Sequence, residues 1–542
     1  MTRRVSTSLV VLSSGVLAAA VLGCAQAPPE PPPPRPLQQV AYLKASNPGM
    51  FDHFGEGGAL DGHIGMGVAI SSDANTMAVG SQHESSNARG INGNRNDESA
   101  YNAGAVYVFT GGGANWTQQA YVKPSNAEGG DHFGSTVALS DNGNTMAVAA
   151  YWESSGATGV NGDEADNSIP QAGAAYVFTR SGTTWTQQAY IKASNTGVPA
   201  VDGVQSDGDQ YGFSLALSGD GNTLAVGAVT EDSSATGING NQADDSAVSA
   251  GAVYVYTRTG TDWSQQGYIK SPPPAKADDA TTGDMFGYSL ALGADGDTLA
   301  VGSYDEDGSS REINGAVDGE RGGSGTAYVF TRAGTTWTQQ AYLKVSNTEG
   351  GDSWGIAVAL SADGNTLAMG TADEDCPATG VNPAGCDDDR EAATSVGAAA
   401  VFVRNGTTWT QQAYIKASNT GVADQFGIRL ALSGDGDALA VAGPSEDSDG
   451  QGINGTQDND SAIEAGAVYL FTRNGAEWAQ QAFIKGSNTE AFDEFGGSVA
   501  LSGDGRTIVV GARGEDSAAQ AVNGDQADNA LDESGAVYVF TR

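Results

Sequence analysis

Short apolar runs separated by polar turns recur along almost the whole chain. In one copy of the pattern the apolar runs occupy residues 213–218, 223–227, 251–256 and 264–270. Aliphatic and aromatic residues bounded by clusters of Gly, Asn and Asp are typical of short β-strands. The turn Gly219-Asp220-Gly221-Asn222 predicts a tight hairpin, because Gly and Asn accept a positive φ. A longer polar loop joins the second run to the third, so each copy predicts four strands.

The four-strand unit is repeated seven times. Its fourth strand begins with variants of Trp-Thr-Gln-Gln-Ala-Tyr at Trp116, Trp185, Trp263, Trp337, Trp409 and Trp478, and a copy without Trp begins at Gln38. Its first strand follows an Asp-x-aromatic-Gly motif, whose in-register glycines are Gly65, Gly134, Gly212, Gly287, Gly355, Gly427 and Gly496. Four-stranded sheets repeated radially make a propeller. The pattern therefore predicts an all-β fold, a seven-bladed β-propeller of four-stranded blades.

The first copy departs from the Asp-x-aromatic-Gly motif. It reads Gly62-His63-Ile64-Gly65, and a second segment, Asp52-His53-Phe54-Gly55, stands ten residues upstream. We assign Gly65 to the repeat, because its distance of 69 residues from Gly134 falls within the spacings of 68–78 residues between the other copies.

The two ends of the repeated region predict that the ring is closed. The region opens with a fourth strand, Gln38–Ser46, and ends on a third strand, Gly535–Arg542. The last blade is therefore one strand short, and we expect the N-terminal strand to complete it. This arrangement also covers a sheet edge that would otherwise be open to pairing with another chain.

The repeated units resemble a known family. The segments Phe-Gly, Val-Ala-Leu-Ser-Gly-Asp-Gly, Leu-Ala-Val-Gly-Ala and Gly-Ala-Val-Tyr-Val-Phe are similar to FG-GAP repeats, the units of the integrin α-chain propeller, and most similar to those of secreted bacterial FG-GAP proteins. The resemblance covers residues 37–542. It implies an extracellular, adhesive or ligand-binding role and names no ligand, because a fold alone does not fix function.

Composition and charge limit the kinds of molecule that the protein is expected to bind. The 65 Asp and Glu residues outnumber the 25 Lys and Arg residues and give a net charge of −40. Such a charge repels phosphate backbones and anionic lipid, so we expect neither nucleic-acid binding nor docking on an anionic membrane. At 39% hydrophobic residues the chain can still bury a core.

The N-terminus has the pattern of an export signal. Arg3 and Arg4 precede an apolar run from Val5 to Leu22, as in a secretory signal peptide. Residues 21–24, Val-Leu-Gly-Cys, resemble the bacterial lipobox, which implies lipidation of Cys24. A plain signal peptide cut near residues 25–27 is the alternative.

These features divide the chain into three parts. Residues 1–23 are expected to be a lipoprotein signal peptide, residues 24–36 a lipidated Cys and a stiff proline-rich tether, and residues 37–542 the propeller. Because residue 25 is not Asp, the lipobox resemblance implies an outer-membrane or cell-surface location. No other apolar run approaches 18 residues, so we expect membrane attachment through the lipid anchor only.

Cys376 and Cys386 flank a short loop rich in Pro and Gly. In an exported protein such a pair favours a local disulfide. A metal pair is the less favoured alternative, because no His or further Cys lies nearby in the sequence.

Two positions of the loop between the second and third strands never vary among the seven copies. The first is Glu, at Glu84, Glu153, Glu231, Glu306, Glu374, Glu446 and Glu515. The second, eight residues later, is Asn, at Asn92, Asn161, Asn239, Asn314, Asn382, Asn454 and Asn523. Aspartates follow in most copies, among them Asp97, Asp166, Asp244, Asp460 and Asp528.

Two hypotheses explain this loop. Oxygen ligands gathered on a flexible loop suit Ca²⁺, which takes six to eight oxygens, so the Glu, Asn and Asp residues of five copies are candidate ligands. The alternative is that the Glu and Asn side chains form hydrogen bonds that hold a long turn without metal. The resemblance implies that the integrin-type calcium loop, Asp-x-Asp-x-Asp-Gly-x-x-Asp between strands one and two, is lost, because that connection is too short here.

Seven of the eight lysines end the fourth strands, at Lys44, Lys123, Lys192, Lys270, Lys344, Lys416 and Lys485. We expect each to meet a neighbouring carboxylate, with a solvated sheet edge as the alternative.

The chain carries no recognisable catalytic motif. The histidines His53, His63, His83 and His132 are scattered over the first two copies without zinc-ligand spacing, and solvated loop positions would explain three of them. A nucleophile elbow and a P-loop are both missing from the sequence. We therefore predict a non-enzymatic cell-surface binding or adhesion protein, stabilised by Ca²⁺ if the loop residues bind it. The alternative is an extracellular glycan-acting hydrolase with its site at the propeller axis. The expected partner is an extracellular protein or glycan.

Overall fold

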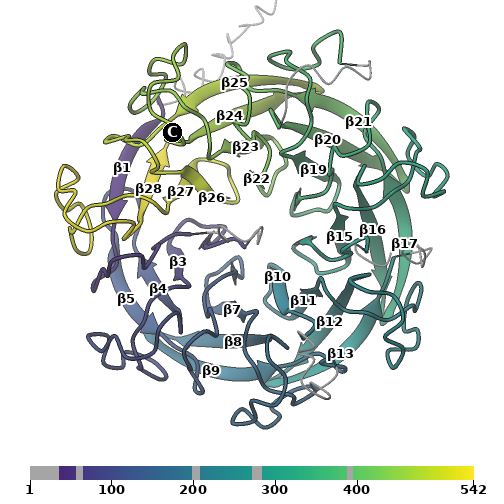
Figure 1. Cartoon of the computed structure of the whole chain (residues 1–542), viewed down its shortest axis with the longest axis horizontal. Helices are drawn as coiled ribbons and strands as arrows, with labels where there is room; N and C mark the ends of the chain where they lie inside the picture. The colour runs from purple at the N-terminus through teal and green to yellow at the C-terminus, as the bar shows by residue number, and fades with distance from the viewer. Residues whose placement is uncertain (1–35, 57–64, 198–207, 272–282, 387–394) are drawn as a thin grey trace, which may run out of the picture. The chain divides into compact units, whose positions relative to one another are not determined.

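The computed structural model describes residues 36–56, 65–197, 208–271, 283–386 and 395–542. In these residues 28 strands form seven four-stranded sheets, which stand in a ring around an axis (Figure 1). The compact unit runs from Leu37 to Arg542. It is the predicted all-β, seven-bladed propeller. The predicted signal peptide, Cys24 and the first residues of the tether lie outside the described residues, within which no helix is long and apolar enough to cross a membrane.

The strands follow the chain blade by blade, from the axis outward. Blade one contains β2 (Val68–Ile70), β3 (Thr76–Ser81), β4 (Ala105–Thr110) and β5 (Thr117–Val122). Blade two contains β6 (Val137–Leu139), β7 (Thr145–Ala150), β8 (Ala174–Ser181) and β9 (Thr184–Ile191). Blade three contains β10 (Tyr211–Leu217), β11 (Thr223–Ala228), β12 (Ala252–Thr259) and β13 (Asp262–Ile269). Blade four contains β14 (Ser289–Leu292), β15 (Thr298–Ser303), β16 (Thr326–Ala333) and β17 (Thr336–Leu343).

The remaining blades repeat this order. Blade five contains β18 (Ala357–Leu360), β19 (Thr366–Thr371), β20 (Ala398–Asn405) and β21 (Thr408–Ile415). Blade six contains β22 (Arg429–Leu432), β23 (Ala438–Gly443), β24 (Ala467–Asn474) and β25 (Glu477–Ile484). Blade seven contains β26 (Phe495–Leu501), β27 (Thr507–Ala512), β28 (Ala536–Thr541) and β1 (Gln38–Leu43).

The core lies between neighbouring blades. The second strand of each blade is buried along its whole length, and the third strand is buried over its first five residues. Sheets covered on both faces need nearly continuous apolar strands, which explains runs such as Leu-Ala-Val and Val-Tyr-Val. The third and fourth strands extend further than predicted, because their pairing continues to Thr259 and Asp262 at the turn.

The N-terminal strand closes the ring, as predicted. β1 pairs antiparallel with β28, from Gln38 opposite Thr541 to Leu43 opposite Val537, and completes the sheet β26-β27-β28-β1. Figure 1 shows the first strand beside the last one at the outer edge of blade seven. Tyr42 and Leu43 are fully buried there.

The assignment of Gly65 to the Asp-x-aromatic-Gly motif is wrong. Phe54 is fully buried and packs against Tyr107 of blade one, with ring centroids 5.3 Å apart, as Phe133 packs against Tyr176 in blade two. Gly55 has a φ of 87°, and a Cβ there would lie 2.6 Å from Val537 of blade seven. The upstream segment therefore fills the wedge between blades seven and one. More residues separate it from the first strand than in the other copies, so the repeat spacing pointed to Gly65 instead.

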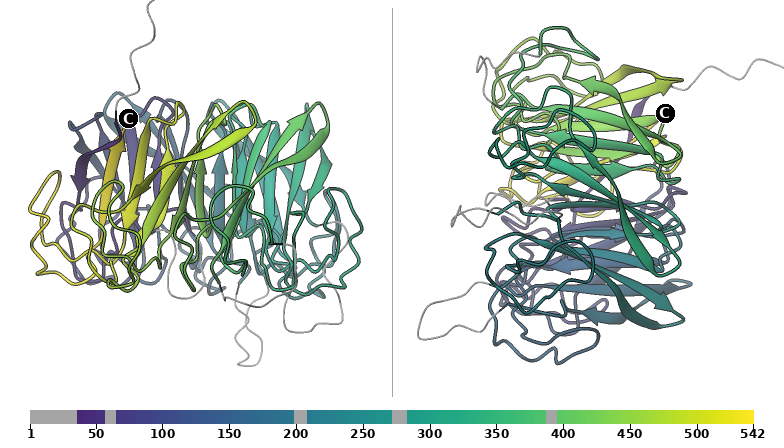
Figure 2. Two further views of the ribbon diagram at one scale, coloured as in Figure 1. Left: turned by 90° about the horizontal axis from the view of Figure 1, so that it is seen from above. Right: turned by 90° about the vertical axis from the view of Figure 1, so that its right-hand side faces the viewer.

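The two faces of the ring differ (Figure 2). The long loops between second and third strands gather at one face, which we call the loop face. The hairpins between first and second strands lie at the other face. There, six backbone N–H groups donate to carbonyls of the next blade over 2.8–3.0 Å, from Ser72, Asp141, Gly219, Ala294, Ala362 and Gly503. These hydrogen bonds draw the hairpins together around the axis.

Cys376 and Cys386 are joined by a disulfide in the loop-face segment of blade five, with Cα atoms 5.3 Å apart. Closing so short a loop reduces the entropy of the unfolded chain by an amount worth about 2–3 kcal/mol. Reduction is expected to lower the melting temperature by a few degrees, as measured by differential scanning fluorimetry with and without reductant. A Cys376→Ser/Cys386→Ser variant is the control, since its melting temperature should not change when the reductant is added. Two free thiols in the mass spectrum of the non-reduced protein would contradict the assignment.

Candidate functional site

The invariant loop glutamates are buried and paired with the invariant lysines. In blade two, Glu153 accepts hydrogen bonds from Lys192 Nζ at 2.7 Å, Tyr190 Oη at 2.9 Å and Asn126 Nδ2 at 3.1 Å. The seven ion pairs are Lys44–Glu515, Lys123–Glu84, Lys192–Glu153, Lys270–Glu231, Lys344–Glu306, Lys416–Glu374 and Lys485–Glu446. The predicted lysine–carboxylate contacts are thus confirmed, and the solvated-edge alternative is wrong. We call each glutamate with its partners a glutamate hub.

The hubs also join neighbouring blades. Asn126 follows the fourth strand of blade one, yet it donates to Glu153 of blade two and accepts from Tyr176 Oη at 2.9 Å. Equivalent amides reach the next glutamate at six of the seven junctions within the described residues, from Asn47, Asn126, Asn195, Asn347, Asn419 and Asn488. The glutamate column therefore holds blades together.

The invariant loop asparagines face the outer strand instead. Asn161 has a φ of 55°, its Oδ1 accepts the backbone N–H of Tyr190 at 3.1 Å, and its own N–H donates to the carbonyl of Tyr190 at 2.7 Å. The same side-chain contact recurs at Asn92, Asn239, Asn314, Asn382, Asn454 and Asn523. A residue that returns the loop to a strand edge in the left-handed region is commonly Asn.

The aspartates of the predicted calcium set bind their own loops or solvent. Asp97, Asp166 and Asp244 accept the backbone N–H of the serine two residues later. Asp460 is exposed and Asp528 is half-exposed. The Glu, Asn and Asp of one loop therefore have different partners, which supports the hydrogen-bonding alternative. Calcium binding stays a prediction, and calorimetric titration of chelator-treated protein with Ca²⁺ tests it.

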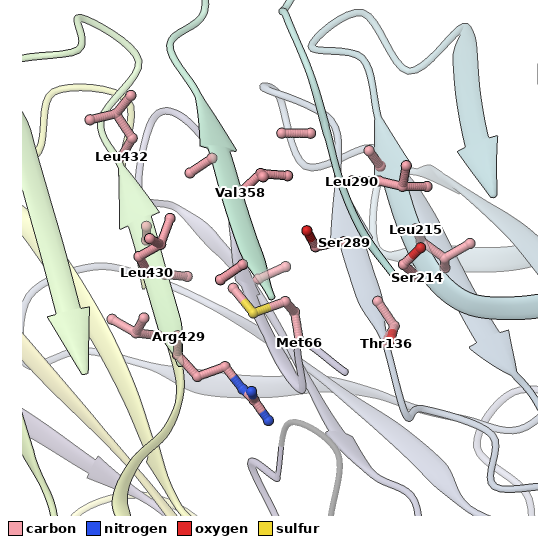
Figure 3. A pocket seen from close by; sticks show the side chains of 18 of the residues that line it. Met66, Thr136, Ser214, Leu215, Ser289, Leu290, Val358, Arg429, Leu430 and Leu432 are labelled. Atoms are coloured by element: carbon pink, nitrogen blue, oxygen red, sulfur yellow. The ribbon is translucent and has the colours of Figure 1, made fainter. Parts of the chain in front are cut away.

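A cavity of about 280 Å³ lies on the axis, inside the seven inner strands. Figure 3 shows Leu215, Leu290, Val358, Leu430 and Leu432 around it. Leu215, Leu290, Val358 and Leu430 occupy equivalent positions in four different blades, so the wall follows the sevenfold pattern.

Arg429 breaks this pattern as the one charged residue among the described residues that line the cavity. Its equivalents are Thr136, Ser214, Ser289, Ala357 and Ser498. The side chain is 5% exposed, and its Nε donates to the carbonyl of Gly497 at 3.0 Å. Burial lowers the pKa of Arg429 to about 10. In Figure 3 its guanidinium extends past the start of β22, which is the loop-face end of the cavity.

Further residues that differ between blades surround that end, which we call the axial mouth. Glu56 is 1% exposed; His53 Nδ1 lies 3.1 Å from its Oε2, and His83 Nδ1 lies 3.2 Å from the same oxygen. Arg513 Nη1 lies 3.4 Å from Glu56 Oε1, and Arg513 also pairs with Glu494. Ser498 Oγ donates to the carbonyl of Gly55 at 2.6 Å, and Arg429 Nε donates to the carbonyl of the adjacent Gly497, so the Glu56 segment and Arg429 meet at the same part of β26.

A continuous series of aromatic rings follows the axial mouth from blade one to blade four. We call it the aromatic arc; its contacts are His83–His132, His132–Trp152, Trp152–Tyr151, Tyr151–Phe213, Phe213–Tyr288 and Tyr288–Tyr304, with ring centroids 4.3–6.4 Å apart. The later blades have Ala372 and Pro444 where the arc has Tyr151 and Tyr304. One side of the mouth is therefore aromatic and the other is charged.

The interpretation of the histidines as scattered is wrong for His53, His83 and His132, and the interpretation as solvated is wrong for His53 and His132. His53 and His132 are each 4% exposed, and the rings of His53, His83 and His132 touch in sequence. His63 lies outside the described residues. Residue spacing missed this group because the three histidines come from separate segments that meet only when the blades close.

Comparison with known proteins identifies the repeat. The family model described as FG-GAP repeat matches residues 116–178 and 478–540. Both matches run from a Trp at the start of a fourth strand to a Phe within the third strand of the next blade. These two segments are FG-GAP repeats within the seven-bladed propeller.

Two solved structures resemble this FG-GAP propeller. The hydrazine synthase of Kuenenia stuttgartiensis matches with 10% identity and a TM-score of 0.44, over 84% of this chain and 96% of that chain. The periplasmic gluconolactonase of Pseudomonas aeruginosa matches with 13% identity and a TM-score of 0.42, over 84% of this chain and 98% of that chain. At these identities neither activity is transferred to this chain. No curated protein matches the chain.

The hairpins of the FG-GAP propeller use their carboxylates internally. In blade three, Ser218 Oγ donates to Asp220 Oδ1 at 2.7 Å, and the Asn222 N–H donates to the same oxygen at 2.9 Å. The Thr223 N–H donates to Ser218 Oγ at 2.9 Å. Ca²⁺ needs at least six oxygen ligands, and this turn offers one carboxylate that already accepts hydrogen bonds within the turn, so the hairpin does not favour calcium binding.

The aspartate that precedes each wedge aromatic predicts a pH dependence of stability. Burial raises the pKa of Asp52, Asp131, Asp284, Asp352 and Asp424 to about 7, and that of Asp209 and Asp493 to about 8. The folded chain therefore keeps protons that the unfolded chain releases near pH 4, and stability falls as the pH rises from about 4 to 8. We expect the melting temperature to be several degrees higher at pH 5 than at pH 8.

Fluorimetric melting curves across this pH range test the prediction. The surface carboxylates also repel one another less at low pH, so the control is an Asp209→Asn/Asp493→Asn variant, whose melting temperature should change less with pH. A melting temperature that rises from pH 5 to pH 8 would contradict the role of these aspartates.

Proposed function

We propose that this FG-GAP propeller is a non-enzymatic binding protein whose ligand occupies the axial mouth on the loop face. The aromatic arc is the observation that carries the proposal. A rigid scaffold that is uniform in its core and varied around one opening is typical of a binding site. The opposite charged side would fix the orientation of a polar ligand.

The backbone at the mouth supports the same proposal. The second residue of Asp-x-aromatic-Gly has a φ of 48–57° in all seven copies, at His53, His132, Gln210, Met285, Ser353, Gln425 and Glu494. A non-glycine residue in this region costs about 1–2 kcal/mol, which Gly would avoid. The chain keeps a side chain at all seven positions and varies its chemistry, which favours a role in recognition.

A glycan is the favoured ligand class. Aromatic faces stack on the apolar faces of sugar rings, while Arg513 and Glu494 offer a donor and an acceptor for hydroxyl groups. The alternative ligand is a protein segment that inserts an apolar side chain into the mouth.

A glycan array followed by calorimetry tests the proposal. We expect Trp152→Ala to weaken binding of an array-selected glycan at least about tenfold, because one lost stacking contact costs about 1–3 kcal/mol. Tyr101→Ala is the matched control, since Tyr101 is an exposed aromatic on the same face (76% exposed) outside the arc. No binding to any glycan, or equal losses from both variants, would overturn the glycan assignment.

A glycan hydrolase with its site at the axis is the second candidate function. It is favoured by the charged groups Glu56, Glu494 and Arg513, which break the sevenfold pattern at the mouth. Mass spectrometry of a bound glycan after prolonged incubation distinguishes the two functions. An intact glycan supports binding alone, and fragments would establish hydrolysis.

We further propose that the propeller is exported and attached by a lipid on Cys24 to the outer membrane or cell surface. The sequence Val-Leu-Gly-Cys at residues 21–24 supports this placement. Incorporation of labelled fatty acid by the native chain, and its loss in a Cys24→Ser variant, is the expected result. Release of an unlabelled native protein into the medium would contradict it.

A further inference from the structure

Three potential metal-binding atoms meet at the axial mouth. His53 Nδ1 and His83 Nδ1 lie 2.8 Å apart, and they lie 3.1 and 3.2 Å from Glu56 Oε2. Within the described residues this is the one group of three His, Cys, Asp or Glu side chains whose ligand atoms lie this close together. All three residues precede or follow the strands of blade one, and other residue types occupy their equivalent positions in most other blades.

A neutral His53 ring cannot satisfy these three atoms by hydrogen bonds alone. His53 Nε2 lies 2.8 Å from Glu533 Oε2. That contact places the proton of a neutral His53 ring on Nε2, which leaves a lone pair on Nδ1. Glu56 Oε2 is also an acceptor. His83 Nδ1–H can donate its one proton to only one of these two acceptors, His53 Nδ1 or Glu56 Oε2. When His53 is neutral, at least two lone pairs therefore converge with no proton between them, and this is the form of the ring that can bind a metal ion.

The geometry fits a transition-metal ion better than hydrogen bonds alone. First-row divalent ions lie about 2.0–2.2 Å from imidazole nitrogens and carboxylate oxygens, so adjacent ligands of an octahedral ion lie about 3 Å apart. The three measured separations bracket that value. Two imidazoles and one carboxylate on one side of an ion also leave coordination positions open. Calcium is disfavoured here, because it takes oxygen ligands.

Supporting contacts hold two of the ligands in place. Glu533 orients the His53 ring through Nε2, which is the usual arrangement for a metal-bound histidine. Arg513 binds the other oxygen of Glu56, at 3.4 Å, which turns Oε2 toward the histidines. The His53 and Glu56 side chains are almost fully buried, while the His83 side chain is 17% exposed and leaves an approach from the mouth.

We propose that His53, Glu56 and His83 bind one divalent transition-metal ion, such as Zn²⁺ or Co²⁺, at the axial mouth. This site uses none of the Glu, Asn and Asp residues considered above as calcium ligands in the seven loops between second and third strands, which we call the acidic loops. It does not depend on the identity of the proposed ligand, because the metal alone is the probe in its test.

The test is calorimetric titration of chelator-treated protein with ZnCl₂, together with the visible absorption spectrum of the protein titrated with CoCl₂. We expect one equivalent to bind, with cobalt bands that show nitrogen ligands. His83→Gln should abolish the cobalt bands and weaken Zn²⁺ binding by more than 100-fold. Glu533→Gln, which alters only the support of His53, should weaken it by about 10–100-fold.

Asp97→Asn is the matched control, because it removes a carboxylate from an acidic loop of the same blade and should leave the affinity unchanged. His83 and Glu533 are partly exposed, so their variants are expected to fold, and melting curves check this. Absence of a one-equivalent zinc site in the native protein would overturn the proposal. Zinc affinity unchanged in His83→Gln would do so as well and would assign the zinc to the acidic loops.

Discussion

A chain that begins at residue 47 is expected to melt at least about 10 °C below one that begins at residue 36, or to lose its cooperative melting transition. The deletion removes β1 and leaves β28 as an open edge. It exposes the surfaces that bury Tyr42 and Leu43, each worth about 1.5–3 kcal/mol, and leaves Glu515 without Lys44, which costs about 3–5 kcal/mol more. Differential scanning fluorimetry of the two chains measures the effect.

A synthetic peptide of residues 37–47 provides the control for this experiment. Added in excess, it should pair with β28 and restore much of the lost melting temperature, because binding to the folded state stabilises it. A peptide with Lys44→Ala should restore less. Equal melting temperatures of the two chains would show that the ring does not depend on its N-terminal strand.

Glu153→Gln is expected to destabilise the propeller by about 3–5 kcal/mol, because it leaves Lys192 buried without a counter-charge. The Gln side chain has nearly the same volume, so little of the loss would come from packing. Equilibrium unfolding in guanidinium chloride measures the change in the free energy of unfolding. A loss below about 1 kcal/mol would mean that this buried pair stabilises the fold no more than an ordinary surface ion pair does.

Two further variants isolate the charge effect. In Glu153→Gln/Lys192→Met neither partner is charged, and the double variant should regain most of the stability lost by the single one. Arg506→Gln removes one partner of an exposed pair, Arg506–Asp504 at 3.8 Å, and should change stability by less than about 1 kcal/mol. A double variant less stable than Glu153→Gln would mean that Lys192 contributes mainly through its other contacts.

Much of the fold was readable from the sequence because its cause is periodic. Each blade repeats the same apolar runs and turn residues, and the order of the runs at the two termini implies the strand exchange at β1 and β28. The one error, at Gly65, arose where periodicity failed. Extra residues after Glu56 moved the wedge upstream, and spacing alone followed the strand instead of the buried Phe54.

The site was predicted less well, since its contacts join distant segments. The invariance of Glu153 was visible, but its partner Lys192 lies 39 residues away and no spacing rule connects them. His53 and His83 meet because two loops of one blade converge at the axis, which sequence distance hides. The available signal was a residue that differs among the copies: Arg429 stands where other blades have Ser, Thr, Ala or Gly.

The asparagine bridges between hubs have a consequence for how the molecule comes apart. In a linear array of repeats the terminal units have one neighbour each, so unfolding starts there and such arrays need special capping repeats. Here each blade has two neighbours, and β1 makes the first unit and the last unit a single blade. No blade can open without breaking two interfaces at once. The circular linkage thus makes the seven blades one cooperative folding unit, in which no blade is a free end where unfolding can start.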